Sequence, residues 1–126
     1  ITCVDAAGRR VELEGFKPPE VGRLTIRGEN GSGKSSFLLE LKRRHPEHSI
    51  ILPAHHRLHF ASVANADVST GQKLSLIMEE LCGVEPLKLL LLDEWDANLD
   101  QENLQRIDAA IGRLARRCCV VEVRHR

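Results

Sequence analysis

Segments with the apolar period of a β-strand alternate along this chain with segments that have the period of an α-helix. RLTIR at 23–27 places alternate residues on one side, and three apolar runs predict further strands, which are HSIILP, KLLLL and CCVVEV. Helical spacing appears at 35–44, at 73–82 and after Asp100, a residue suited to cap a helix. This alternation predicts an α/β fold with a mostly parallel sheet flanked by helices.

The residues before RLTIR predict a small antiparallel hairpin at the N-terminal side of this sheet. TCVD and RRVELE can both form strands, and they flank the turn-like AAG. No internal repeat, low-complexity tract or linker interrupts the pattern. We therefore expect a single domain that spans residues 1–126.

Composition narrows the class of protein without naming a function. Lys plus Arg and Asp plus Glu number 18 each, so neither a basic nucleic-acid face nor an acidic tail is expected. No apolar run reaches the roughly 18 residues of a membrane span, and no signal peptide is visible. The four cysteines form no CxxC pair. The adjacent Cys118 and Cys119 would point to opposite faces of a strand, as reduced thiols of a cytosolic protein.

A glycine-rich motif marks the passage from the RLTIR strand to the first helix. GENGSGKS at 28–35 fits G-x-x-x-x-G-K-[ST] in full. Its glycines allow a tight turn whose backbone N–H groups point at phosphate oxygens, and the following helix adds its positive N-terminal end. Lys34 can reach the β- and γ-phosphates of a nucleotide, and the Ser35 hydroxyl can ligate Mg²⁺. The strand before and the helix after the motif predict the phosphate-binding loop of a P-loop NTPase.

Two carboxylates follow the most apolar strand. LLLLDE at 89–94 ends a buried run with Asp93 and Glu94. In a parallel sheet, ligand sites lie at the carboxyl ends of the strands. We therefore expect Asp93 to hold Mg²⁺, directly or through water, and Glu94 to act as the general base for an attacking water.

The order of these and other motifs resembles the nucleotide-binding domain of ATP-binding cassette (ABC) proteins. GENGSGKSS is similar to the Walker A motif of that family, and EPLKLLLLDE is similar to the approach to Walker B. STGQK at 69–73, preceded by Val68, resembles the signature LSGGQ, with Thr70 at a glycine position. DANLD at 96–100 resembles the D-loop, and VEVRHR places His125 at the position of the switch histidine. The resemblance covers most of the chain.

The resemblance implies an enzyme that binds ATP and Mg²⁺ and hydrolyses ATP to ADP and phosphate. It implies Glu94 and His125 as catalytic residues, Ser35 and Asp93 as metal ligands, and Asp100 as part of the D-loop. The residues implied to contact the nucleotide are Asn30, Gly31, Ser32, Gly33, Lys34, Ser35 and Ser36. In the family two domains pack head to tail, so the signature would act on ATP held by a second copy or a homologous ABC domain. The signature residues are Ser69, Thr70, Gly71 and Gln72.

The chain departs from the family pattern between its two halves. About 13 residues separate Ala54 from Val68, too few for the helical subdomain of the family. Ala54 or His55 stands at the Q-loop position, and the chain has no Tyr to stack on adenine. The closing strands after His125 are lacking. Either the cassette is pared down, or residues near 60–67 have been excised.

Three further groups of residues predict structure more than chemistry. Trp95 stands where the family has proline, and we expect it to pack in the core. Three histidines lack a clear spacing for metal ligands, and these are His55, His56 and His59. Four arginines are expected on a solvated face, and these are Arg113, Arg116, Arg117 and Arg124.

The leading interpretation is an ABC-type ATPase whose ATP-bound dimer drives a transporter or a soluble machine. It would lie in the cytoplasm or on the cytoplasmic face of a membrane, with transmembrane subunits or a fused membrane domain as partners. A second interpretation is the head of an SMC-like or DNA-repair ATPase without its coiled coil, with DNA as a partner. A third is a nucleotide-gated dimerisation module with little turnover, because the adenine and Q-loop positions are degenerate.

Overall fold

The computed structural model describes residues 1–52, 80, 87–97 and 99–124. In chain order, its elements are β1 (Thr2–Val4), β2 (Gly22–Arg27), α1 (Lys34–Arg44), β3 (Ser49–Leu52), β4 (Leu89–Asp93), α3 (Gln101–Leu114) and β5 (Cys119–Val123). None of the helices described is long and apolar enough to cross a membrane. The predicted helix at 73–82 and the STGQK segment lie outside the described residues, apart from Glu80.

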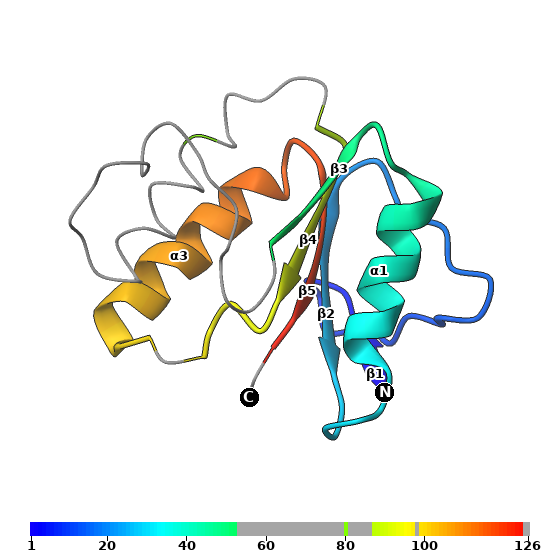
Figure 1. The fold of residues 1–126 in the computed structure, drawn as a ribbon. Helices are drawn as coiled ribbons and strands as arrows, with labels where there is room; N and C mark the ends of the chain where they lie inside the picture. Colours follow the sequence, from blue (N-terminus) through cyan, green and yellow to red (C-terminus); the bar gives the residue numbers. More distant parts are fainter. Residues whose placement is uncertain (53–79, 81–86, 98, 125–126) are drawn as a thin grey trace.

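The strands form one sheet in the order β1-β2-β5-β4-β3. β1 is antiparallel to β2, whereas β2, β5, β4 and β3 are parallel to one another. The predicted α/β fold with a mostly parallel sheet is thus confirmed, and Figure 1 shows the parallel strands ending at one edge, at the bottom of the view. β5 lies between β2 and β4, so that Val121 is opposite Leu24 on one side and Leu91 on the other.

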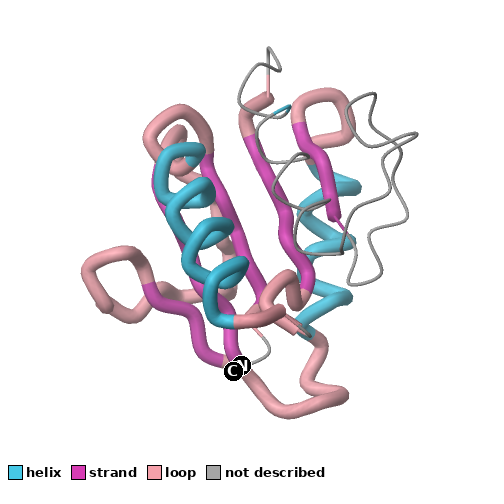
Figure 2. The backbone as a smooth tube through the Cα atoms, turned by 90° about the vertical axis from the view of Figure 1, so that its left-hand side faces the viewer, coloured by secondary structure: helices cyan, strands magenta, loops and turns pink. Residues whose placement is uncertain are grey.

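The two helices cover opposite faces of this sheet (Figures 1 and 2). Alternate residues of each central strand therefore enter two different apolar clusters, with Leu91 on the α1 side and Leu90 on the α3 side. Cys118 and Cys119 also fall into different clusters, as the sequence predicts, and both thiols are buried.

Local sequence accounts for the ends of both helices. α1 ends at Arg44 because the His45 N–H turns back to the carbonyls of the last helical turn and Pro46 follows, which has no N–H to donate. α3 begins after Asp100, whose carboxylate accepts a hydrogen bond of 2.8 Å from the backbone N–H of Asn103. The face of α3 that lies against the sheet is buried, with Ile107, Ala110, Ile111 and Leu114 as its buried members.

The predicted N-terminal hairpin is only partly correct. The turn between its arms forms, but β1 pairs along its length with β2, and RRVELE reaches it through a single bridge between Val4 and Arg10. The chain then leaves the strand direction because Phe16 is buried against Phe37 of α1, with the ring centroids 5.7 Å apart.

Cys119 provides a pH-dependent test of this packing. Burial, followed by the charges of the neighbouring Cys118 and Cys3, raises the pKa of the Cys119 thiol from 9.0 to about 12. The thiol therefore ionises at lower pH in the unfolded chain. Its contribution to the free energy of unfolding is complete below about pH 9 and is lost as the pH rises towards 12.

Between about pH 8 and pH 11, the unaltered chain should lose about 2–3 kcal/mol more stability than Cys119→Ala. Urea titrations followed by the fluorescence of the single tryptophan measure this difference. Equal losses in the two proteins would contradict the burial of this thiol.

Candidate functional site

The loop that joins β2 to α1 turns sharply at the edge where the parallel strands end (Figure 1). Gly31 and Gly33 adopt left-handed backbone conformations, with φ of 82° and 95°, which residues with side chains rarely adopt. A Cβ atom at Gly28 would lie 2.7 Å from Ser32 Oγ, so any side chain at that position would force the Ser32 hydroxyl to move. Ser32 Oγ is itself buried and has no hydrogen-bond partner within the described part of the chain.

A nearly buried cation and a helix N-terminus lie together at the end of this loop. Lys34, the first residue of α1, is nearly buried, and its Nζ donates a hydrogen bond to the carbonyl of Gly28. Gly33 caps α1 without a side-chain acceptor, and the first turn of the helix has no acidic residue. The cation and the positive end of the helix dipole therefore lie together without an anionic side chain from that turn.

A hydrogen bond joins the start of α1 to the end of β4. Ser35 Oγ donates to Asp93 Oδ2 over 2.9 Å, although 58 residues separate the two in sequence. The positions of these side chains are set by two elements, because Ser35 lies in the first turn of α1 and Asp93 is the last residue of β4. The two oxygens predicted to hold Mg²⁺ are thus brought together.

The donor set of this pair fits Mg²⁺. A hydroxyl and a carboxylate are hard oxygen ligands, and Mg²⁺ in proteins is usually held by one or two carboxylates together with substrate phosphates and water. Among the residues that the structure describes, no group of three or more His, Cys, Asp or Glu side chains could hold a metal ion by itself. Ser35 and Asp93 would therefore share the ion with a bound phosphate group.

Glu94 has an unusual backbone conformation directly after this pair. Its φ is 48°, and it is the one described non-glycine residue with a positive φ. Its N–H donates a hydrogen bond of 2.8 Å to the carbonyl of Val123 in β5, and its own carbonyl accepts one of 3.2 Å from the N–H of Ala97. Such strain commonly occurs at functional sites, where the surrounding structure holds the residue in place.

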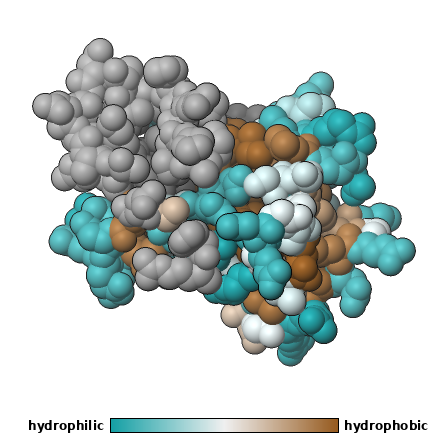
Figure 3. All heavy atoms as spheres, turned by 60° about the horizontal axis from the view of Figure 1, so that its bottom comes forward, coloured by the Kyte–Doolittle hydropathy of each residue, from teal (hydrophilic) through white to brown (hydrophobic). Residues whose placement is uncertain are grey.

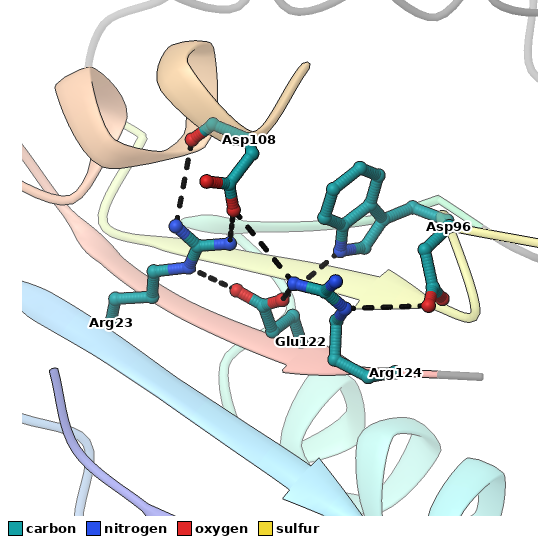
Figure 4. A network of polar contacts seen from close by, with 6 residues as sticks. Arg23, Asp96, Asp108, Glu122 and Arg124 are labelled. Carbon is teal, nitrogen blue, oxygen red and sulfur yellow. Dashed lines mark hydrogen bonds and ion pairs between the residues drawn. The ribbon is translucent and has the colours of Figure 1, made fainter. Parts of the chain in front are cut away.

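A buried network of charges lies beside this segment, on the α3 side of the sheet (Figure 4). Glu122 of β5 has no exposed surface, and its carboxylate accepts hydrogen bonds from Arg23, Arg124 and the indole N–H of Trp95. Burial lowers the pKa of Arg23, but the bonds and charges of Glu122 and Asp108 outweigh it and raise that pKa above its ordinary value. The core position predicted for Trp95 is confirmed.

The prediction that Arg124 belongs to a solvated face is wrong. Its side chain is only 19% exposed and forms ion pairs with Asp96, Asp108 and Glu122, because buried carboxylates require cationic partners. Its guanidinium also lies over the Trp95 ring, 4.8 Å from the centroid. The other three arginines of that group are exposed as predicted.

Sequence analysis also missed Glu122 and Arg23. The available signal was the glutamate within the otherwise apolar run CCVVEV, because a charge in a buried strand needs a partner. That partner could not be named, since Arg23 lies 99 residues away in sequence.

Some of the remaining predicted site residues lie at exposed or helix-capping positions, and the others lie outside the described part of the chain. Asn30 and Ser36 are exposed in the glycine-rich loop and the first turn of α1, while Asp100 caps α3. Figure 3 looks towards this edge of the molecule, where hydrophilic residues cover much of the described surface and hydrophobic residues appear between them. The residues outside the described part of the chain are His55, His56, His59, Ser69, Thr70, Gly71, Gln72 and His125.

Two hollows lie at the opposite, amino-terminal edge of the parallel strands. One, of about 730 Å³, borders the start of β2 and includes Phe16 and Val21; the other, of about 490 Å³, includes His48, Lys88 and Arg117. Neither touches the pair formed by the α1 and β4 side chains. Because ligands of parallel sheets bind at the carboxyl ends of the strands, we place the candidate site at the glycine-rich loop.

Comparison of the chain with models of protein families gave no match, and comparison with curated proteins gave no significant match.

The backbone of Glu94 supplies a test of strain at the candidate site. Glu94→Gly should be more stable than Glu94→Ala by about 1 kcal/mol, because glycine adopts a positive φ without a steric penalty. The same comparison at exposed Gln105 of α3 should give the opposite order, with glycine less stable by about 1 kcal/mol. Urea unfolding of the four variants measures both differences, and an Ala variant as stable as the Gly variant at position 94 would contradict the strained conformation.

Proposed function

We propose that this chain is an ATP-binding and ATP-hydrolysing domain of the P-loop class, with an organisation similar to ABC ATPases. The observation that carries the proposal is the 2.9 Å hydrogen bond between Ser35 and Asp93. It joins the glycine-rich loop to the acidic end of β4 in three dimensions, as a shared site for a phosphate-bound metal requires. Two neighbours in sequence support the same function. Lys34, which precedes Ser35, is a nearly buried cation, and Glu94, which follows Asp93, has a strained backbone.

The residues of the loop bind the phosphates in this proposal. The N–H groups at the start of α1 donate to phosphate oxygens, and Lys34 exchanges its bond to the Gly28 carbonyl for the β- and γ-phosphates. Ser35 and Asp93 would hold Mg²⁺, and the bound ion would neutralise negative charge on the phosphates.

Glu94 acts as the general base. Its carboxylate takes a proton from the water that attacks the γ-phosphorus. The bond between that phosphorus and the oxygen bridging to the β-phosphate breaks, and ADP leaves with its electron pair. The left-handed backbone of Glu94 sets the direction of its Cα–Cβ bond. The base is therefore oriented before the nucleotide binds.

The ABC-type organisation extends this proposal to a dimer. Its support is the order of motifs in the sequence, in which STGQK precedes the acidic strand and DANLD follows it. A second copy or a homologous domain would contribute Ser69, Thr70, Gly71 and Gln72 to the γ-phosphate, and His125 would contact that phosphate from the end of β5. A transporter or a soluble machine in the cytoplasm would use the opening and closing of this dimer.

Removal of the Lys34 amine should weaken ATP binding. Lys34→Ala should lower the affinity for ATP with Mg²⁺ by about 10- to 100-fold, because one charge-assisted contact to the phosphates is lost. Isothermal titration calorimetry measures the affinity. Lys88→Ala removes the same charge from an exposed position at the opposite edge of the sheet and should leave the affinity unchanged. Equal affinities of the Lys34 variant and the unaltered chain would contradict the assignment of the loop.

Removal of the base should separate hydrolysis from binding. Glu94→Gln keeps the shape of the side chain but cannot accept the proton, so phosphate release should fall by about 10² to 10⁴-fold. ATP affinity should be retained or increased, because a negative charge near the triphosphate is lost. A phosphate-release assay measures turnover, and size-exclusion chromatography with and without Mg-ATP detects the persistent dimer.

Glu102→Gln, on the exposed face of α3, is the matched control. Turnover that survives in the Glu94 variant would exclude it as the base, and a monomer at saturating ATP would contradict the dimer.

A further inference from the structure

The carboxyl end of β5 is bonded on both sides, to the segment that carries Glu94 and to β2. On one side of the strand end, the backbone N–H of Glu94 donates to the carbonyl of Val123 over 2.8 Å. On the other side, the backbone N–H of Arg124 donates to the carbonyl of Ile26 in β2 over 3.1 Å. The end of β5 thus connects the strand before the glycine-rich loop with the residue proposed as the base.

Side chains clamp the two residues that follow Glu94. Trp95 is 1% exposed, and its indole N–H donates to Glu122 Oε1 over 3.1 Å. Asp96 is also buried, and its Oδ2 lies 3.4 Å from Nε of Arg124. Arg124 lies over the ring of Trp95 and donates from Nη1 to the same oxygen of Glu122 over 3.3 Å. One guanidinium therefore contacts both residues after Glu94 and also the carboxylate that accepts the hydrogen bond of Trp95 (Figure 4).

The contacts of Arg124 also extend to α3 and, through shared carboxylates, to β2. Nη1 of Arg124 also lies 3.8 Å from Asp108, a half-exposed residue in the middle of α3. Arg23 of β2 binds the same aspartate and the same glutamate, so two arginines and three carboxylates form one connected group. The position of the Glu94 segment is therefore tied to α3 and to β2 as well as to its own strand.

We propose that Arg124 is a positioning residue for Glu94: it covers the Trp95 ring that is bonded to Glu122, pairs with Asp96, and so maintains the left-handed backbone from which the Glu94 side chain projects. This inference rests on the proposed function, because it assigns Arg124 a role in the hydrolysis performed by Glu94. Within the described part of the chain, the side-chain partners of Arg124 are Glu122, Asp96, Asp108 and Trp95. They do not include Lys34 or the Ser35–Asp93 pair. Loss of the clamp should consequently affect the chemical step and leave nucleotide binding in place.

The experiment compares turnover and binding in the full chain. Arg124→Met keeps much of the length of the side chain but removes its charge and its donors. We expect kcat for ATP hydrolysis to fall by about 10- to 100-fold, the effect of a catalytic group displaced by about 1 Å, while the affinity for Mg-ATP stays within about twofold. Arg124→Lys should recover part of kcat, because its cation can still face Glu122 and Asp96.

The single tryptophan of the chain, Trp95, reports on the clamp without reference to activity. In Arg124→Met its emission should move to longer wavelength and its quenching by acrylamide should increase, because the ring loses its cover. Arg106→Met removes an exposed arginine of α3 that pairs with Glu102, and it should change neither the emission nor kcat.

Each outcome decides between the two proposals. Unchanged kcat in an Arg124→Met protein with altered Trp95 emission would overturn the positioning role and leave the proposed function intact. A parallel loss of kcat and ATP affinity would also overturn it, since this result indicates general destabilisation. Absence of ATP hydrolysis by the unaltered chain would overturn both. If Arg124→Met does not fold, Trp95→Phe replaces it: an aromatic ring remains under Arg124, the bond to Glu122 is lost, and kcat should fall about tenfold at unchanged affinity.

Discussion

The burial of one carboxylate, that of Glu122, constrains much of this structure. A charge without access to water in the middle of a central strand is stable only if donors surround it. Arg23, Trp95 and Arg124 supply these donors from β2, from the segment after β4 and from the end of β5. Removal of one member of such a group typically costs about 3–5 kcal/mol, because the remaining charges are left buried and unpaired. The requirement to satisfy Glu122 therefore fixes the relative positions of three chain segments on the α3 side of the sheet.

The central position of β5 has a corresponding effect on the candidate site. Because this strand lies between β2 and β4, the glycine-rich loop and the acidic strand end are neighbours of the same strand and not of each other. The first turn of α1 bridges the gap, and the bond from Ser35 to Asp93 closes it. The site thus depends on a strand, Cys119–Val123, none of whose own side chains is proposed to bind phosphate; the proposed phosphate contact His125 follows it in sequence. The backbone of this strand holds Glu94 through Val123 instead.

Stability and the proposed chemistry have opposite requirements at the end of β4. A left-handed backbone at Glu94 costs about 1–2 kcal/mol for a residue with a Cβ atom. The clamp of Trp95, Arg124 and Glu122 offsets this cost by burying an aromatic ring against a paired guanidinium. Such an arrangement is expected where a side chain must point in one direction before its substrate arrives.

The sequence by itself determined the local features of this protein. The periods of its apolar residues predicted the five described elements that follow β2, which are α1, β3, β4, α3 and β5. Asp100 predicted the start of α3. These features depend on neighbours within a few residues. The motif at 28–35 likewise indicated the loop, and the carboxylates after LLLL indicated its acidic partner. Only the tertiary structure decided that Ser35 meets Asp93, that β1 pairs with β2 instead of RRVELE, and that Arg124 is an internal cation and not a surface one. The contacts from Ser35 to Asp93 and from Arg124 to Asp96 and Asp108 join residues well separated in sequence, and the pairing of buried charges and the completion of the sheet decide which segments meet.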